Sequence, residues 1–201
     1  MRCHLIMLKF KKDWLLIDKI DTIELNLAID KIIKDFDVEL MKEVSTHGKN
    51  SKQYRLTQYL KNHTVSNLVK NKIKTLLTNK FNQNTRLDLV SAWTVKGQEH
   101  GFHVLHKHDY SIRSHINEDK TMHIASVIYL NMPKPIKESV SRETNNFYCI
   151  LNRNGETGYY TYKPVVGDII VFPIWLWHGA YPQSKGLRQT LNMDFEVNFD
   201  F

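Results

Sequence analysis

Two histidines, His106 and His108, are spaced so that both side chains can bind one metal ion. They lie in a segment of strand character, and side chains at positions i and i+2 of a strand point to the same face. His103 lies three residues before His106, so a regular strand would place it on the opposite face. His100 shares the face of His106 but is too far along the strand. The spacing therefore predicts a metal site that starts from His106 and His108.

A third ligand has to come from elsewhere in the chain, and His178 is the best candidate. It follows a turn and an apolar run, Gly167–Pro173, and lies between Trp177 and a glycine, a poor place for a solvated side chain. Arg188 comes ten residues later, and Thr190 shares a strand face with it. A guanidinium binds a carboxylate through two hydrogen bonds, and a hydroxyl adds a further donor. This pair therefore predicts a carboxylate-binding site.

The second half of the chain contains the short strands that must position these residues. Runs of β-branched and aromatic residues, separated by Gly, Pro and Asn, are typical of strands. The runs lie at residues 87–95, 101–108, 123–131, 146–151, 159–162, 168–172 and 190–197. Several short strands at close spacing favour a sandwich or barrel such as a jelly roll.

The first half of the chain has helical periodicity. Asp21 and Glu24 have the spacing of a capping box, with Asp21 as the N-cap. Apolar residues then recur at helical spacing over residues 25–41 and again over residues 65–77. The polar residues 45–58 between them predict a loop or an insert.

Length and composition fit one α+β domain spanning residues 1–201. We expect a helical N-terminal part at residues 1–86, packed outside a barrel core at residues 87–201. Of the 201 residues, 42% are hydrophobic and 24% charged, so a core needs no disulfide support. The short N-terminal apolar run predicts no signal peptide, and no segment has the length of a membrane span. The two cysteines match no disulfide framework, which favours a cytoplasmic location.

Positive charge is concentrated in the N-terminal half of the chain. The net charge is +7, and no acidic residue occurs between Glu43 and Asp88. Such a segment, residues 45–87, predicts either a solvated helix face or a surface for an anionic partner such as nucleic acid. No nucleic-acid motif accompanies it, which favours the solvated face.

Five segments in a fixed order resemble the Fe(II)/2-oxoglutarate-dependent oxygenase superfamily, and most of all its small bacterial and phage members. The resemblance covers about residues 88–197. The segments are Gly101–His108, Ser126–Pro133, Gly167–Pro173, Trp177–Gly179 and Arg188–Thr190. Each is weak alone, and the ordered set is more specific.

The resemblance implies a double-stranded β-helix, which is a jelly-roll core, with Fe(II) at one end. His106 then matches the first iron ligand and His178 the distal histidine. Arg188 matches the residue that binds the C5-carboxylate of 2-oxoglutarate, and Thr190 the accessory hydroxyl. Tyr129, on the Ser126–Pro133 strand, is also placed to reach this cosubstrate.

One position departs from the family pattern. Most members have His-x-Asp or His-x-Glu, which supplies the carboxylate of a two-histidine, one-carboxylate site. Here His108 stands at that position. Three interpretations remain: His108 binds the metal, Asp109 replaces it through a local bulge, or the site has lost iron. The bacterial and phage relatives also have His-x-His there, which favours His108.

The implied activity is hydroxylation of an unknown substrate, with decarboxylation of 2-oxoglutarate to succinate. One alternative is a cupin-like metal dioxygenase or isomerase that does not use 2-oxoglutarate and in which Arg188 is structural. A second is a basic nucleic-acid-binding protein that uses the barrel as a scaffold and residues 45–87 for contacts. The two ideas can also combine, with the basic segment delivering an anionic substrate to the iron.

Overall fold

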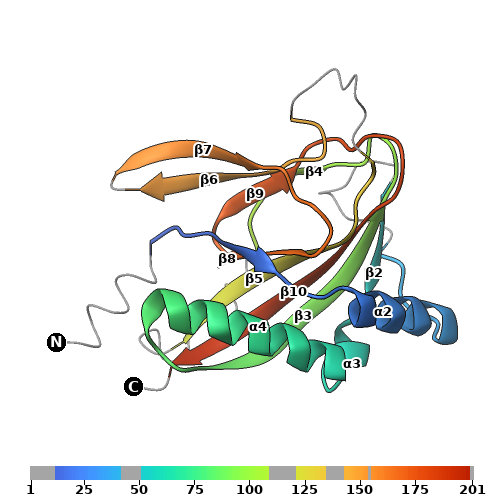
Figure 1. Ribbon diagram of the computed structural model, residues 1–201, viewed down its shortest axis with the longest axis horizontal. Helices are drawn as coiled ribbons and strands as arrows, with labels where there is room; N and C mark the ends of the chain where they lie inside the picture. The colour runs from blue at the N-terminus through green and yellow to red at the C-terminus, as the bar shows by residue number, and fades with distance from the viewer. Residues whose placement is uncertain (1–11, 42–50, 109–120, 135–142, 154, 200–201) are drawn as a thin grey trace.

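Two antiparallel sheets form the core of the protein in a computed structural model, which describes residues 12–41, 51–108, 121–134, 143–153 and 155–199 (Figure 1). The major sheet has the order β1-β8-β5-β10-β3-β2. Its strands are β1 (Leu16–Lys19), β8 (Asp168–Pro173), β5 (Thr121–Asn131), β10 (Arg188–Phe199), β3 (Thr85–Gly97) and β2 (Ser51–Arg55). The minor sheet has the order β4-β9-β6-β7, from β4 (His103–His106), β9 (Trp177–Ala180), β6 (Phe147–Arg153) and β7 (Glu156–Tyr162). In chain order, the strands from β3 to β10 pass back and forth between the two sheets, which is the arrangement of a jelly roll. This confirms the predicted fold class.

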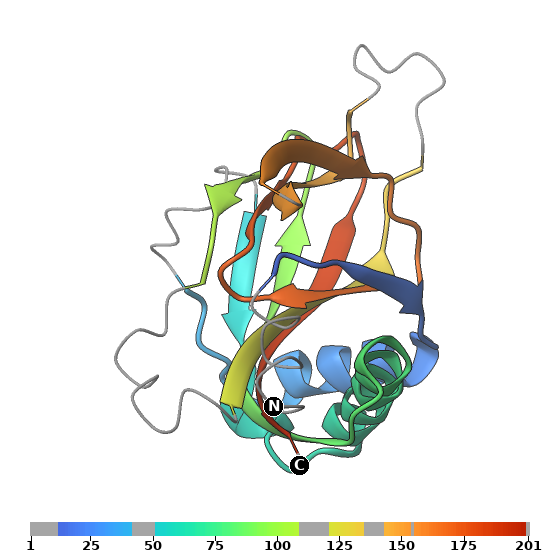
Figure 2. The same cartoon turned by 90° about the vertical axis from the view of Figure 1, so that its left-hand side faces the viewer.

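Helices cover the outer face of the major sheet. They are α2 (Ile23–Asp35), α3 (Thr57–Leu60) and α4 (Thr64–Phe81). Figure 2 shows them, in blue and green, on the side of the molecule opposite to the orange strands β6 and β7. None of the described helices is long and apolar enough to cross a membrane.

The longest helix, α4, forms because its apolar residues fall on one face. Val65, Val69, Ile73 and Leu77 recur every four residues and are almost completely buried. The side chain of His63 accepts a hydrogen bond from the main-chain N–H of Val65 at 3.2 Å, which satisfies one free donor of the first turn. Burying each such aliphatic side chain contributes about 1.5–3 kcal/mol, so the sheet holds the helix mainly through this face.

The major sheet separates two apolar cores. One lies between the sheet and the helices, and the other lies between the two sheets, where Phe147 and Cys149 of β6 meet Phe172 of β8. The central strand β10 contributes to both sides. Its apolar residues Leu191 and Met193 pack against the helical layer, and its polar residues alternate with them and point between the sheets. The polar side of β10 carries the candidate site.

The N-terminal part is not purely helical, contrary to the sequence-based expectation. β1 pairs with β8, and β2 pairs with β3 and so extends the major sheet at its other edge. The sequence analysis predicts a loop at residues 51–55 because this segment, Ser-Lys-Gln-Tyr-Arg, contains no aliphatic residue. Main-chain hydrogen bonds to β3, rather than burial of apolar side chains, define this strand. The capping prediction is shifted by one residue: Thr22 is the N-cap of α2, and the carboxylate of Asp21 accepts from the N–H of Ile23 at 2.9 Å.

Candidate metal and cosubstrate site

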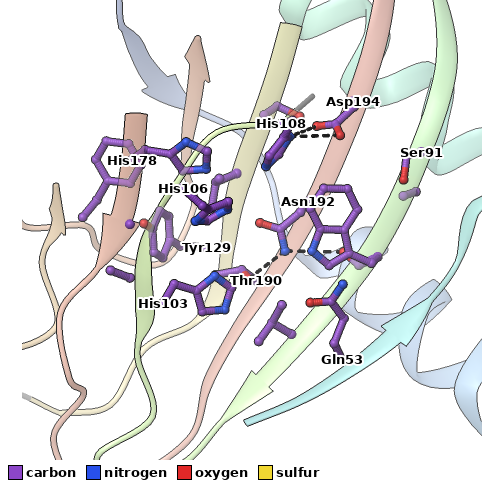
Figure 3. Close-up of a pocket in the computed structure, with 18 of the residues that line it drawn as sticks. Gln53, Ser91, His103, His106, His108, Tyr129, His178, Thr190, Asn192 and Asp194 are labelled. Atoms are coloured by element: carbon purple, nitrogen blue, oxygen red, sulfur yellow. Dashed lines mark hydrogen bonds and ion pairs between the residues drawn. The ribbon is translucent and has the colours of Figure 1, made fainter. Parts of the chain in front are cut away.

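Three histidines from two strands and their ends meet between the sheets (Figure 3). His106 of β4 and His178 of β9 are direct cross-strand partners, and their ring centroids are 4.3 Å apart. His108 lies just beyond β4, where its N–H donates to the carbonyl of Ile174 at 2.9 Å. One ligand nitrogen from each of the three rings lies within 4.8 Å of the others. The structure therefore brings together the three residues predicted as metal ligands.

In each of the three rings, Nδ1 is held by a hydrogen-bond partner. Nδ1 of His106 donates to the carbonyl of Val104 at 2.8 Å, and Nδ1 of His178 donates to the carbonyl of Leu176 at 2.9 Å. Nδ1 of His108 lies 3.1 and 3.2 Å from the two carboxylate oxygens of Asp194. When Nδ1 carries the proton, Nε2 of a neutral imidazole has a free lone pair, as a metal ligand requires.

His178 is in an environment that keeps it neutral. Burial lowers its pKa well below the ordinary value, and the nearby rings of His108 and His106 lower it further. A neutral ring is the form that binds a metal ion. Three imidazole donors suit iron as well as zinc, copper and nickel, so the donor set fits an Fe(II) ion.

His103 is on the same side of β4 as His106, contrary to the expectation from regular alternation. A shift of register lies between these two residues, and their ring centroids are 6.0 Å apart. Such a bulge turns the preceding side chain to the other face, and His103 consequently lines the pocket. Its ring is not part of the three-histidine cluster.

Arg188, the first residue of β10, is a buried cation that lines the same pocket. Only 4% of the residue is exposed, and its guanidinium donates long hydrogen bonds to the carbonyls of Tyr181 and Gly101, at 3.3 and 3.4 Å. Burial lowers its pKa, although an arginine remains charged. No ion pair involves Arg188 within the described parts of the chain. A buried charge of this kind is costly unless an anion accompanies it.

Two hydroxyls lie beside Arg188, as the sequence predicted. Thr190 is opposite Tyr129 in the pairing of β10 with β5, and both residues line the pocket. Burial raises the pKa of the Tyr129 hydroxyl, so it keeps its proton and can donate to an anion. The position of Thr190 is supported by Asn192, whose amide donates to its hydroxyl at 3.1 Å.

The polar row of β10 extends further than the sequence analysis recognised. Arg188, Thr190, Asn192 and Asp194 alternate along the strand, are buried and line one pocket. Asn192 and Asp194 were missed, although continuing the i+2 spacing from Arg188 would have found them. Their alternation with Leu191 and Met193 is the signal.

The pocket itself is a cavity of about 350 Å³ between the two sheets. That size is within the usual range for small-molecule sites. Besides the histidines and the Arg188 group, Gln53, Trp93 and Arg55 line it, on the β2–β3 side. Asp109, the alternative third ligand, lies outside the described residues.

Comparison with known proteins agrees with this fold. Residues 91–194 match the family model described as "Putative 2OG-Fe(II) oxygenase". The match covers half of the chain, and the protein belongs to this family. The resemblance inferred from the sequence is thereby confirmed, and so are its activity class and its cofactors, Fe(II) and 2-oxoglutarate. None of the curated proteins compared with the sequence matches it.

Solved structures of distant sequence share the fold. A prolyl-4-hydroxylase from Pseudomonas putida is 13% identical, with a TM-score of 0.56 over 96% of this chain and 97% of that one. The viral collagen prolyl hydroxylase of Paramecium Bursaria Chlorella virus-1 is 14% identical, with a TM-score of 0.59 over 92% and 96%. HygX from Streptomyces hygroscopicus, solved with nickel, 2-oxoglutarate and hygromycin B, is 12% identical, with a TM-score of 0.58 over 98% and 87%.

Proposed function

We propose that His106, His108 and His178 hold the Fe(II) of this oxygenase and that Arg188, Thr190 and Tyr129 bind 2-oxoglutarate. The observation that carries the proposal is the buried guanidinium of Arg188, which shares one cavity with the three-histidine cluster. A dicarboxylate anchored on Arg188 would extend along the polar row of β10 toward the metal. Its far carboxylate would then lie on the arginine, and its keto-acid end would lie toward the three histidines.

The protein's own residues would position and shield the reaction. The guanidinium of Arg188 binds the far carboxylate where water screens the interaction poorly, and the Tyr129 and Thr190 hydroxyls donate to the same group. Bound Fe(II) supplies oxygen activation coupled to conversion of 2-oxoglutarate to succinate and carbon dioxide. The buried rings of Phe147 and Phe172 against His178 exclude water from that side.

The substrate would approach from the side of the pocket formed by β2 and β3. Gln53, Trp93 and Arg55 lie there, on the two strands beside the polar row of β10. The similar structures include proteins described as prolyl hydroxylases and one solved with hygromycin B. We propose hydroxylation as the reaction. The residues on the β2–β3 side of the pocket do not point to one class of substrate.

The test measures Fe(II) binding without oxygen, and then succinate release from 2-oxoglutarate. We expect the wild type to bind Fe(II) and produce succinate. Arg188→Ala should lower kcat/KM for 2-oxoglutarate by about a hundredfold, because charge-assisted hydrogen bonds are worth about 1.5–3 kcal/mol each. It should leave Fe(II) affinity nearly unchanged.

The control variant is Arg86→Ala, which removes an exposed arginine paired with Asp88 on the surface. It should behave like the wild type. A wild type that binds no Fe(II), or an Arg188→Ala variant with normal 2-oxoglutarate turnover, would refute the assignment. The second outcome would mean that Arg188 is structural and that another residue binds the far carboxylate of 2-oxoglutarate.

A further inference from the structure

The carboxylate of Asp194 is buried directly behind one of the three histidines. Asp194 is inaccessible to solvent on the central strand β10, and both of its oxygens lie within 3.2 Å of Nδ1 of His108. Figure 3 shows the carboxylate on the side of the ring that faces away from the other two histidines. A buried carboxylate is costly unless a charged or donor group accompanies it.

His108 differs from the other two histidines in what orients its ring. His106 and His178 each donate from Nδ1 to the main-chain carbonyl two residues earlier, so their own strands hold them. His108 depends on a side chain from a different strand, 86 residues away in sequence. Its orientation is therefore tied to the chemistry of Asp194.

We propose that Asp194 is a positioning residue that supplies, through His108, the negative charge that an all-histidine iron site otherwise lacks. This inference rests on the proposed metal site. In the usual family arrangement a carboxylate binds the iron directly and offsets one unit of its charge. Here the carboxylate contacts the histidine ligand instead of the metal. It accepts a hydrogen bond from Nδ1 of His108, fixes the tautomer of the ring and makes Nε2 a stronger metal ligand.

Asp194 acts behind the ligand rather than as a ligand. Its oxygens contact Nδ1, the nitrogen remote from the point shared by the three rings, and the cluster of candidate ligands in the described chain contains only the three histidines. His108 and Asp194 together therefore take the place of one aspartate or glutamate.

The first test measures Co(II) affinity by calorimetry and the visible spectrum of the Co(II)-loaded protein. Asp194→Asn should weaken Co(II) binding by about 10- to 100-fold and shift the spectrum, because groups that orient metal ligands have effects of that size. The control is Glu196→Gln, two residues further along β10, whose carboxylate lies 3.7 Å from His123 instead. It should bind Co(II) like the wild type.

If Asp194 acts by positioning His108, the effect of Asp194→Asn must depend on the presence of His108, whereas the effect of a general structural role would not. In a His108→Ala background, Asp194→Asn should change Co(II) affinity by less than about twofold, because coupled residues are not additive. Thermal unfolding with chelator present measures the stability of each variant separately. Normal Co(II) affinity in Asp194→Asn, or an equal loss with and without His108, would overturn the inference.

A second pair of variants tests the same inference in a site that has the usual carboxylate ligand. His108→Asp restores the usual ligand set but places two carboxylates side by side in a buried site. We expect His108→Asp/Asp194→Asn to bind Co(II) at least about tenfold more tightly than His108→Asp alone, since like charges there repel strongly. Equal affinities would contradict the inference. A wild type that binds no Co(II) would instead refute the proposed metal site itself.

Discussion

At the scale of single residues, the site combines two kinds of side chain with opposite electrical needs. The histidines must remain neutral to bind a metal ion, and burial lowers the pKa of His178 in that direction. Arg188 is buried as a cation in the same pocket, where an anionic ligand would compensate its charge. The histidines belong to the minor sheet and its ends, and Arg188 belongs to the major sheet, so the two kinds of side chain line different walls of the cavity.

Tyr129 allows a prediction about the cosubstrate. Because burial raises its pKa, the hydroxyl stays protonated at neutral pH and donates to the anion. Tyr129→Phe should raise the Kd for 2-oxoglutarate by about tenfold, the cost of about 1.4 kcal/mol for one lost hydrogen bond to a charged group. Calorimetry with Co(II)-loaded protein measures this affinity.

The matched control for Tyr129→Phe is Tyr160→Phe, on the exposed strand β7. It should leave the Kd unchanged. If Tyr129→Phe binds 2-oxoglutarate as tightly as the wild type, Tyr129 is not part of that site.

Residue spacing predicted the members of the site better than it predicted their surroundings. His106 and His108 were predicted to lie together because strand alternation is a local rule that can be applied to the sequence alone. The same rule failed for His103, because a bulge depends on the partner strand β9 and leaves no sign in the sequence. Asp194 was missed because its role depends on a contact with a residue on another strand.

At the scale of elements, the pairing of β4 with β9 determines the distance between His106 and His178. Gly179, next to His178, makes this close approach possible. A Cβ atom there would lie 2.5 Å from the Tyr148 ring and 2.8 Å from the carbonyl oxygen of His103. Both neighbours are part of the minor sheet, so the strands would have to separate.

Gly179→Ala should therefore weaken Co(II) binding by about tenfold or more, because small misplacements of ligands are costly. Gly158→Ala on β7 is the matched control, since the nearest atom to a Cβ there is 3.9 Å away. Calorimetric titration compares the two variants. Unchanged affinity in Gly179→Ala would mean that β9 adapts without moving His178.

Strands with apolar alternation were predicted well, and those without it were not. β5, β8 and β10 have the expected apolar runs. β2 is polar, and β9 is a four-residue segment around Trp177 and His178 that gave no strand signal. Their positions follow from pairing with β3 and with β4 and β6, which are long-range contacts.

At the scale of the whole molecule, the lysine-rich helix α4 and the pocket lie on opposite faces of the major sheet. α4 packs on the face of β10 that carries Leu191 and Met193, whereas the pocket opens on the face that carries Asn192 and Asp194. An anionic polymer bound along α4 would be separated from the histidines by a sheet. This arrangement argues against delivery of a substrate to the metal by the α4 lysines.

Lysines of α4 can accordingly be neutralised without effect on catalysis. Lys70→Gln/Lys74→Gln should leave kcat/KM for 2-oxoglutarate within about twofold of the wild type, measured as succinate release. Nucleic-acid binding by residues 45–87 remains a separate prediction. A salt-dependent affinity for DNA or RNA that falls in this variant would support it. A large loss of turnover would contradict the separation of the two faces.

Both faces of β10 are constrained, and this limits how the gene can change. A single substitution alters one face of the strand, but an inserted or deleted codon at the start of the strand would exchange the two faces. Arg188 would then turn toward the helices, and leucine and methionine would take the places of the amide and carboxylate in the pocket. Because successive side chains of a strand point to opposite faces, one such event would disrupt both the packing of β10 against the helices and the lining of the pocket. Length variation among related genes should therefore be found in the loops and not within this strand.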